Sequence, residues 1–326
     1  MIAPPPPGPR GDAPFPRRRV LGLGALGFGM LALSSARATE GATILVPGPE
    51  DGACARWATR AAGIMARGTQ RAGTTRLSVL GGPDGVTAAN RFATLDGAGG
   101  PSLLALPGWT CHARLTGSSR ARFEPRSWLP LLLSWRGAVL AGRGPLPARG
   151  TPVRVAMPSA EAPEAAVLAA MDLLGLSGLP LVAQPEAAFA AGEADALIVL
   201  GPEPLARAQA MGATPWYGFP GPAELERAEV APFPLSAPLA RAVTAAVAAL
   251  QVRAVLVAPV LSAADSVAAW RMAAGRWQEE ERTMPGEDQP LVAASAAEAF
   301  ALVTPPADAV LDYRNWLERR LGWRPG

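Results

Sequence analysis

Two acidic residues, Glu50 and Asp51, lie in a loop where a small ligand could bind. The loop follows residues 43–46, an aliphatic run typical of a buried parallel strand, and apolar residues recur at helical spacing after it. Loop amides and the dipole of such a helix favour an anion, whereas two carboxylates facing the ligand would favour an amine or a zwitterion. Alternatively, Asp51 is the N-cap of the helix and Glu50 is solvated. The sequence leaves both interpretations open.

The other reactive side chains are one histidine, His112, and two cysteines, Cys54 and Cys111. They are too few and too far apart for a metal site, so we expect no metal. A nucleophile needs a base that a third group orients, and no nucleophile-elbow motif surrounds Ser118 or Ser119. Neither a P-loop nor a G-x-G-x-x-G motif follows a strand. We therefore expect no catalytic residues, no cofactor and no enzyme.

Cys54 and Cys111 could form a disulfide, because each follows a predicted strand and these strands are expected to lie near each other in one sheet. A bridge requires a Cα separation below about 7 Å. Two separate buried thiols that act as small apolar residues are the alternative.

Strands alternate with helices in two series along the chain. The first series has strands expected at residues 43–46, 76–80 and 102–106, a short helix at 90–95 and a loop at 107–112. The second has strands expected at 153–157 and 194–200, with a helix at 165–174. Later helices are expected near 239–250 and 307–321. This alternation predicts an α/β protein with parallel-rich sheets whose loops gather at one edge.

A segment rich in glycine and proline separates the two series of strands and helices. We expect one domain from residues 39–141 plus 257–326 and a second from residues 142–256, joined by two crossing segments. Ligand would then lie in a central cleft between the domains.

Residues 1–38 have the pattern of a signal peptide. Three consecutive arginines, residues 17–19, precede a glycine-rich apolar run, and residues 36–38 match the small-x-small pattern before a cleavage site. The arginines resemble a twin-arginine signal, with a plain Sec signal as the alternative. We expect export to the periplasm and cleavage after Ala38.

The signal segment also accounts for the basic charge of the chain. It carries five arginines against one aspartate, a net charge of +4, so the stated +3 of the whole chain leaves about −1 for the remainder. We therefore expect no nucleic-acid partner.

In the order of its motifs, the chain resembles the receptors of tripartite tricarboxylate transporters, the extracytoplasmic solute-binding proteins also called the Bug family. Residues 44–52, I-L-V-P-G-P-E-D-G, resemble the family's first strand and loop. The turn at 81–85, the apolar runs at 128–133 and 139–141, the G-E-A-D at 192–195 and the V-A-P at 257–259 resemble its later motifs. The resemblance implies a two-domain fold like the type II periplasmic binding proteins, with a cleft and a hinge.

The resemblance further implies a receptor that captures a small carboxylate-bearing or zwitterionic solute for a membrane transporter or sensor, and that acts as a monomer. Four loops would contact the solute, at residues 48–53, 107–111, 158–161 and 201–203. The site residues expected from these loops are Gly48, Pro49, Glu50, Asp51, Gly52, Ala53, Trp109, Thr110, Ser159, Ala160, Glu161, Gly201 and Glu203.

The first loop departs from the family pattern. Gly48 replaces an aromatic residue, Glu50 and Asp51 partly replace a glycine pair, and Ala55 stands where the family has its ligand-reading aspartate. An exported domain that has lost its ligand and serves a partner protein is therefore the alternative function. A cleft filled by Trp109 and Met157 would favour that alternative.

Export predicts a defined new N-terminus. The protein recovered from the periplasm should begin at Thr39, because signal peptidase cleaves after a small-x-small pattern such as residues 36–38. N-terminal sequencing and intact mass measure this directly. A folded periplasmic protein that retains Met1 would contradict the prediction.

Overall fold

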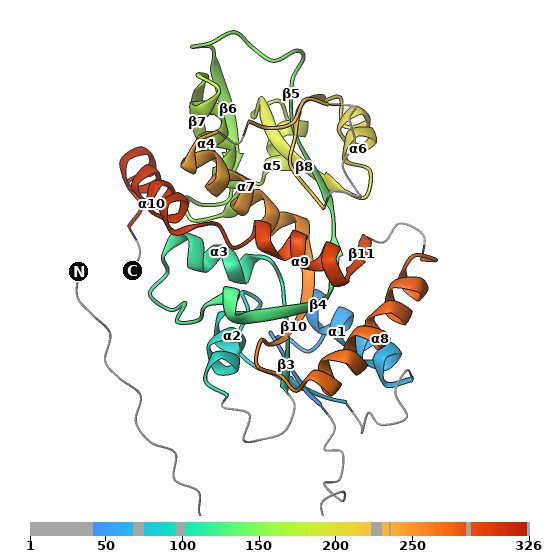
Figure 1. Cartoon of the computed structure of the whole chain (residues 1–326). Helices are drawn as coiled ribbons and strands as arrows, with labels where there is room; N and C mark the ends of the chain where they lie inside the picture. The colour runs from blue at the N-terminus through green and yellow to red at the C-terminus, as the bar shows by residue number, and fades with distance from the viewer. Residues whose placement is uncertain are drawn as a thin grey trace, which may run out of the picture. The chain divides into compact units, whose positions relative to one another are not determined.

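The computed structural model describes residues 42–67, 75–95, 102–222, 230–234, 236–284 and 288–324. The expected signal segment and its cleavage position lie outside these residues. The described chain is α/β: helices cover two sheets that contain parallel strands (Figure 1). The fold class predicted from the sequence is thereby confirmed.

The first sheet has six strands in the order β11-β4-β10-β3-β1-β2. They are β1 (Thr43–Val46), β2 (Arg76–Val79), β3 (Ser102–Leu106), β4 (Trp128–Trp135), β10 (Val252–Pro259) and β11 (Gln289–Val292). β1 pairs in parallel with β2 and β3, while β10 runs antiparallel between β3 and β4. The three strands expected at residues 43–46, 76–80 and 102–106 are confirmed. The aliphatic runs of β1 and β3 are buried in the sheet, whereas β2 lies at its edge and is at most half-buried.

Helices cover both faces of the first sheet. α1 (Ala53–Arg67) and α8 (Ala264–Glu281) pack on the face that receives Ile44 and Val46. α2 (Val86–Ala93), α3 (Trp109–Thr116) and α9 (Ala293–Leu302) pack on the face that receives Leu45. This alternation of side chains is the period of two that a strand buried on both faces requires.

Two expectations in this half were wrong. The short helix lies at Val86–Ala93 rather than 90–95, and a hydrogen bond of 3.2 Å from the backbone N–H of Val86 to the Asp84 carboxylate marks its start. Residues 109–112 begin helix α3 and do not form a loop. The buried face of α3 includes the polar Thr110 and His112, so its sequence lacks the apolar period by which a helix is recognised.

The second sheet has five strands in the order β7-β6-β8-β5-β9. They are β5 (Gly137–Gly142), β6 (Pro152–Met157), β7 (Ser177–Val182), β8 (Ala196–Gly201) and β9 (Thr214–Gly218). β6 pairs in parallel with β7 and β8, and β5 runs antiparallel between β8 and β9. α5 (Pro185–Ala190) and α6 (Pro204–Ala210) cover one face. α4 (Ala166–Leu173), α7 (Pro238–Gln251) and α10 (Ala307–Leu321) cover the other.

The strands of the two sheets are joined at two adjacent crossing points (Figure 1), and a third passage leads from α9 on the first sheet to α10 on the second. β4 leads through Arg136 into β5, and α7 leads at Gln251 into β10. The backbone N–H of Arg136 donates to the carbonyl oxygen of Gln251 at 2.9 Å, and its guanidinium donates to that of Leu250 at 2.8 Å. The sheets therefore change at residues 136 and 251–252, a few residues before the domain boundaries expected at 141/142 and 256/257.

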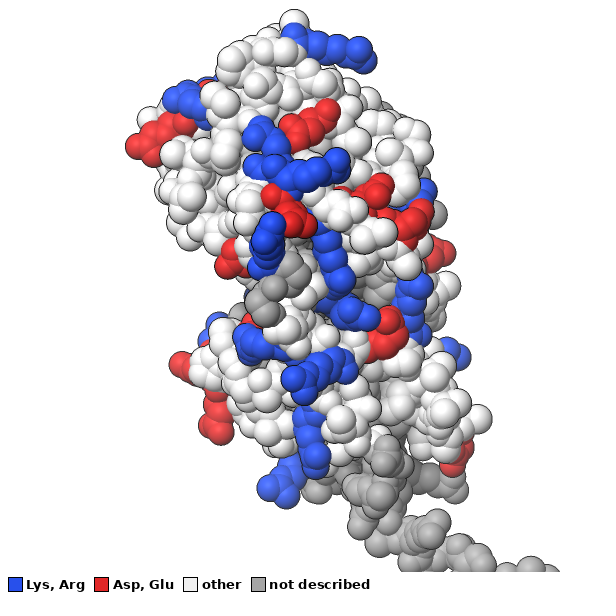
Figure 2. Space-filling model, turned by 90° about the vertical axis from the view of Figure 1, so that its left-hand side faces the viewer, with Lys and Arg blue, Asp and Glu red and all other residues white. Residues whose placement is uncertain are grey.

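Helix α10 packs against α7 and the core of the second sheet, although we expected residues 257–326 to accompany the first. Polar contacts reinforce this packing: the Trp316 indole donates to Asp172 at 2.8 Å, and Arg241 on α7 pairs with Asp308 at 2.6 Å. Figure 2 shows acidic side chains among the arginines of the face that carries α10. The division into two domains remains a prediction.

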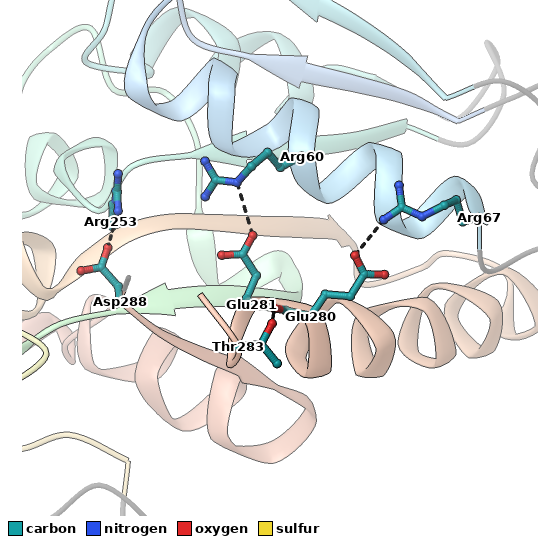
Figure 3. Close-up of polar contacts among 7 residues, drawn as sticks. All are labelled: Arg60, Arg67, Arg253, Glu280, Glu281, Thr283 and Asp288. Atoms are coloured by element: carbon teal, nitrogen blue, oxygen red, sulfur yellow. Dashed lines mark hydrogen bonds and ion pairs between the residues drawn. The ribbon is translucent and has the colours of Figure 1, made fainter. Parts of the chain in front are cut away.

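Ion pairs of unequal burial hold the helices and strands of the first half together (Figure 3). Arg67 on α1 pairs with Glu280 on α8 at 2.8 Å, and both side chains are more than half exposed. Arg253 on β10 pairs with Asp288 at 2.9 Å, and the Asp288 side chain is only 7% exposed. Desolvation makes a carboxylate such as Asp288 depend on its partner far more than Glu280 does.

This difference predicts unequal effects of two matched substitutions. Arg253→Met should lower the free energy of unfolding by about 2–3 kcal/mol, because it leaves the Asp288 carboxylate buried beside an apolar side chain. Arg67→Met should lower it by about 1 kcal/mol or less, because the exposed pair is screened by water. Urea unfolding of the two variants measures both values. Equal losses would contradict this account of the two pairs.

Candidate functional site

In each sheet, the end of one parallel strand reaches the two crossing segments. At the end of β3, the backbone N–H of Gly108 donates to the carbonyl oxygen of Val252 at 3.0 Å. At the end of β8, Gly201 pairs with Gly137, the residue after Arg136. The carboxyl ends of the strands, where α/β sheets expose amides to ligands, thus meet at the same place from both sides.

A cavity of about 360 Å³ lies at the carboxyl ends of β6 and β8. It is bounded by strand residues of this sheet, by the 3-10 turn η2 (Pro163–Ala165), by the start of α5 and by Leu250 at the end of α7. Its lining residues are Ala156, Glu164, Val167, Gln184, Pro185, Glu186, Ala187, Leu197, Ile198, Leu200 and Leu250. We take this cavity as the candidate site, because it adjoins the crossing and mixes apolar walls with a few polar groups.

None of the site residues expected from the sequence lines this cavity. Ser159 and Ala160 are half-buried and Glu161 is exposed in the loop that leads from β6 to η2. Gly201 is buried at the end of β8, and Glu203 is exposed at the N-cap of α6. These two loops of the second sheet are therefore close in sequence to residues that line the cavity. Their part in binding remains a prediction.

The first loop, residues 48–53, is folded against the turn after β2. The backbone N–H of Gly48 donates to the carbonyl oxygen of Gly81 at 3.2 Å, and a Cβ at Gly48 would lie 2.5 Å from that oxygen. A side chain cannot fit there, so glycine rather than an aromatic residue follows the first proline. Pro49, Glu50, Asp51 and Ala53 are exposed, and Gly52 is half-buried.

The prediction that Asp51 is the N-cap of α1 was wrong by one residue. Helix α1 begins at Ala53, and the backbone N–H of Arg56 donates to the carbonyl oxygen of Gly52 at 2.9 Å. Gly52 therefore occupies the cap position. Asp51 instead offers its own backbone carbonyl to the Arg56 guanidinium.

The first two residues of α3, both expected in the site, differ in burial. Thr110 is fully buried, and its hydroxyl donates to the backbone carbonyl of Asp84 at 2.9 Å. Trp109 is 44% exposed, so it neither packs in the core nor fills a cleft. Met157 is buried in the core of the second sheet. Among the described residues, therefore, this pair does not fill the site.

The structure contains no bridge between the two cysteines. Both thiols are free, and Cys54 packs with the core on the α1 side of the first sheet while Cys111 packs on the α3 side. The strands before them are paired, as expected, but the helices that carry them leave toward opposite faces. The possible disulfide is thereby excluded, and burial raises the pKa of each thiol to about 12.

Two lining residues that sequence reasoning missed carry charge. Arg207 donates to both carboxylate oxygens of Glu186, at 2.8 and 3.0 Å, so the charge of Glu186 is balanced. Glu164 has no such partner: its Oε2 atom is buried and makes no hydrogen bond among the described residues. Burial raises the pKa of Glu164, and a hydrogen bond from its own backbone N–H opposes the shift. The lining includes no Lys, Arg or His from the described residues.

The described residues form no group of His, Cys, Asp and Glu that could hold a metal ion. His112 is buried on α3, its ring lies 6.3 Å from that of Tyr313, and its Nε2 atom has no hydrogen-bond partner in the described part of the chain. Burial lowers the pKa of His112 to about 3, so the imidazole is neutral in the folded protein. In the same part of the chain, no helix is long and apolar enough to cross a membrane.

No family model and no curated relative match the chain. Among solved structures, it is similar to a TctC solute-binding protein from Polaromonas, solved without ligand. The two are 12% identical and align over 86% of this chain and 98% of the other, with a TM-score of 0.59. The chain is also similar to MatC from Rhodopseudomonas palustris, solved with bound malate. The two are 18% identical and align over 86% of this chain and 98% of the other, with a TM-score of 0.46.

The resemblance stated from the sequence is thus confirmed at the level of fold. The chain has the fold of the TctC-type solute-binding proteins, and the low identity makes it a divergent example. The Polaromonas protein is a solute-binding protein.

The buried neutral imidazole predicts a pH dependence of stability. The unfolded chain binds a proton at His112 below pH about 6.5, whereas the folded chain does not do so until pH about 3. Stability from this residue is therefore lost as the pH falls through this window, by about 1.4 kcal/mol per pH unit. His112→Gln removes the titrating group and should reduce the slope of unfolding free energy against pH by that amount. Urea unfolding between pH 4 and 6 tests this, and equal slopes for both proteins would refute it.

Proposed function

We propose that the chain is an extracytoplasmic receptor that captures a small carboxylate-bearing or zwitterionic solute and delivers it to a tripartite tricarboxylate-type transporter. The observation that carries the proposal is the meeting of strand ends from both sheets at the hydrogen-bonded crossing, beside a cavity of about 360 Å³. A volume of this size is in the range of small-molecule sites. The fold of the TctC-type solute-binding proteins supports the same function.

Closure around the crossing provides the mechanism. Two halves whose strands are joined by short segments can rotate about these segments, and a solute held at the strand ends would bridge the two halves. Loops 48–53 and 107–111 would then approach the solute from the first sheet as the halves close. The protein would act as a monomer in the periplasm.

One observation favours a second candidate function. Neither loop of the first sheet lines the cavity, and Glu50 and Asp51 are exposed in the loop where the family has a glycine pair. An exported domain that has lost its ligand and serves a partner protein would tolerate both changes. Absence of binding to any small solute is what this alternative predicts.

A thermal-shift screen of the purified protein against carboxylates, amino acids and polyamines separates the two functions. A solute at 100 times its Kd stabilises the folded state by about 2.7 kcal/mol. For a chain of this size the midpoint of unfolding should rise by about 4–5 °C. Calorimetry on each hit confirms the affinity. Failure of every compound to raise the midpoint would contradict the receptor and favour the partner-binding domain.

A further inference from the structure

We propose that Glu164 selects a solute that carries a protonated amine, so that the cavity prefers amines and amino acids to dicarboxylates. The inference rests on the proposed function, since it assigns the solute class of the same site. Helix and loop amides alone would favour an anionic ligand, whereas this inference requires a ligand that carries a positive charge.

One oxygen of the Glu164 carboxylate, the Oε2 atom, is unpaired in the described part of the chain. Glu164 lies in the turn η2 and lines the cavity, and its Oε2 atom is buried without a donor among the described residues. A buried acceptor without a donor is costly, and native structures nearly always supply one. The donor is therefore expected from outside these residues, through the cavity.

Nearby groups of the described residues do not supply that donor. Burial raises the pKa of the Tyr313 phenol, and the negative charge of nearby Glu164 raises it further. The Tyr313 hydroxyl is nevertheless buried without a hydrogen-bond partner in the described part of the chain. Of the arginines near the site, Arg207 binds Glu186 and Arg136 donates to the Leu250 carbonyl. The Nε atom of Arg136 is buried without a hydrogen-bond partner in the described part of the chain, and the Oε2 atom of Glu164 accepts from neither arginine.

The charged side chains of the cavity wall are acidic. Its charged lining residues are Glu164 and Glu186, and only Glu186 is balanced by an ion pair. The remaining lining is apolar except for the amide of Gln184. An ammonium group brings three donors and a compensating charge to Glu164, whereas a carboxylate brings neither and is repelled. The wall therefore discriminates by the sign of the ligand's charge.

Three probes of matched chain length test the inference by calorimetry on the purified protein: 1,4-diaminobutane, 4-aminobutanoate and succinate. At least one amine-bearing probe should bind 10-fold or more tightly than succinate. Glu164→Gln should weaken that probe 10-fold or more and leave succinate unchanged or strengthened. The control is Glu193→Gln, which removes an exposed carboxylate just before β8 that is outside the lining, and it should change no affinity by more than twofold.

The outcomes separate this inference from the proposed function. Succinate binding as tightly as the amines, or Glu164→Gln leaving amine affinity unchanged, overturns the amine preference while the receptor function stands. Absence of binding by these probes and by every compound of the wider screen overturns both. Circular dichroism of Glu164→Gln establishes that a loss of binding does not come from unfolding.

Discussion

The rest of the structure depends on one backbone hydrogen bond between the two crossing segments, from the N–H of Arg136 to the carbonyl of Gln251. A third segment joins them where Gly108 donates to Val252. A Cβ at Gly108 would lie 2.4 Å from the backbone oxygen of Ala249, so only glycine allows this approach. Because these contacts are made by backbone atoms, they bring the strand ends of both sheets together whatever side chains the binding loops carry.

Helix α7 gives this crossing a rigid base. Most of its residues are buried, and many are alanine, whose small side chain lets neighbouring helices approach closely. Val243, Val247 and Leu250 pack in the core of the second sheet, whereas Ala248 packs in the core of the first. The same helix therefore anchors both halves, and its end supplies both Leu250 to the cavity and Gln251 to the crossing.

The sequence predicted the parts of the fold whose burial follows a simple period. The aliphatic runs of β1, β3 and β6 and the apolar face of α10 could be recognised, because each buries a continuous set of large side chains. β7 and β9 were missed because each includes a proline and β7 is largely exposed, which hides the alternation. α3 was missed because polar Thr110 and His112 occupy its buried face.

The residues that line the candidate site could not be predicted from the sequence, and none of the expected site residues is among them. Strand ends and loops could be located from glycine and proline, and two of the expected loops lie next to the cavity. Glu164 and Gln184 gave no signal, because each follows a loop whose path determines which side chain faces inward. The two cysteines show the same limit: pairing of their strands was expected, but the face toward which each helix leaves was not.

The central claim is that a solute binds at the strand ends beside the crossing. Hydrogen–deuterium exchange of the purified protein, with and without a saturating solute found by calorimetry, tests it most directly. The account predicts slower exchange in residues 156–164 and 184–187 and around residues 250–252. Slower exchange elsewhere in the chain, with these three segments unchanged while the solute is bound, would contradict it.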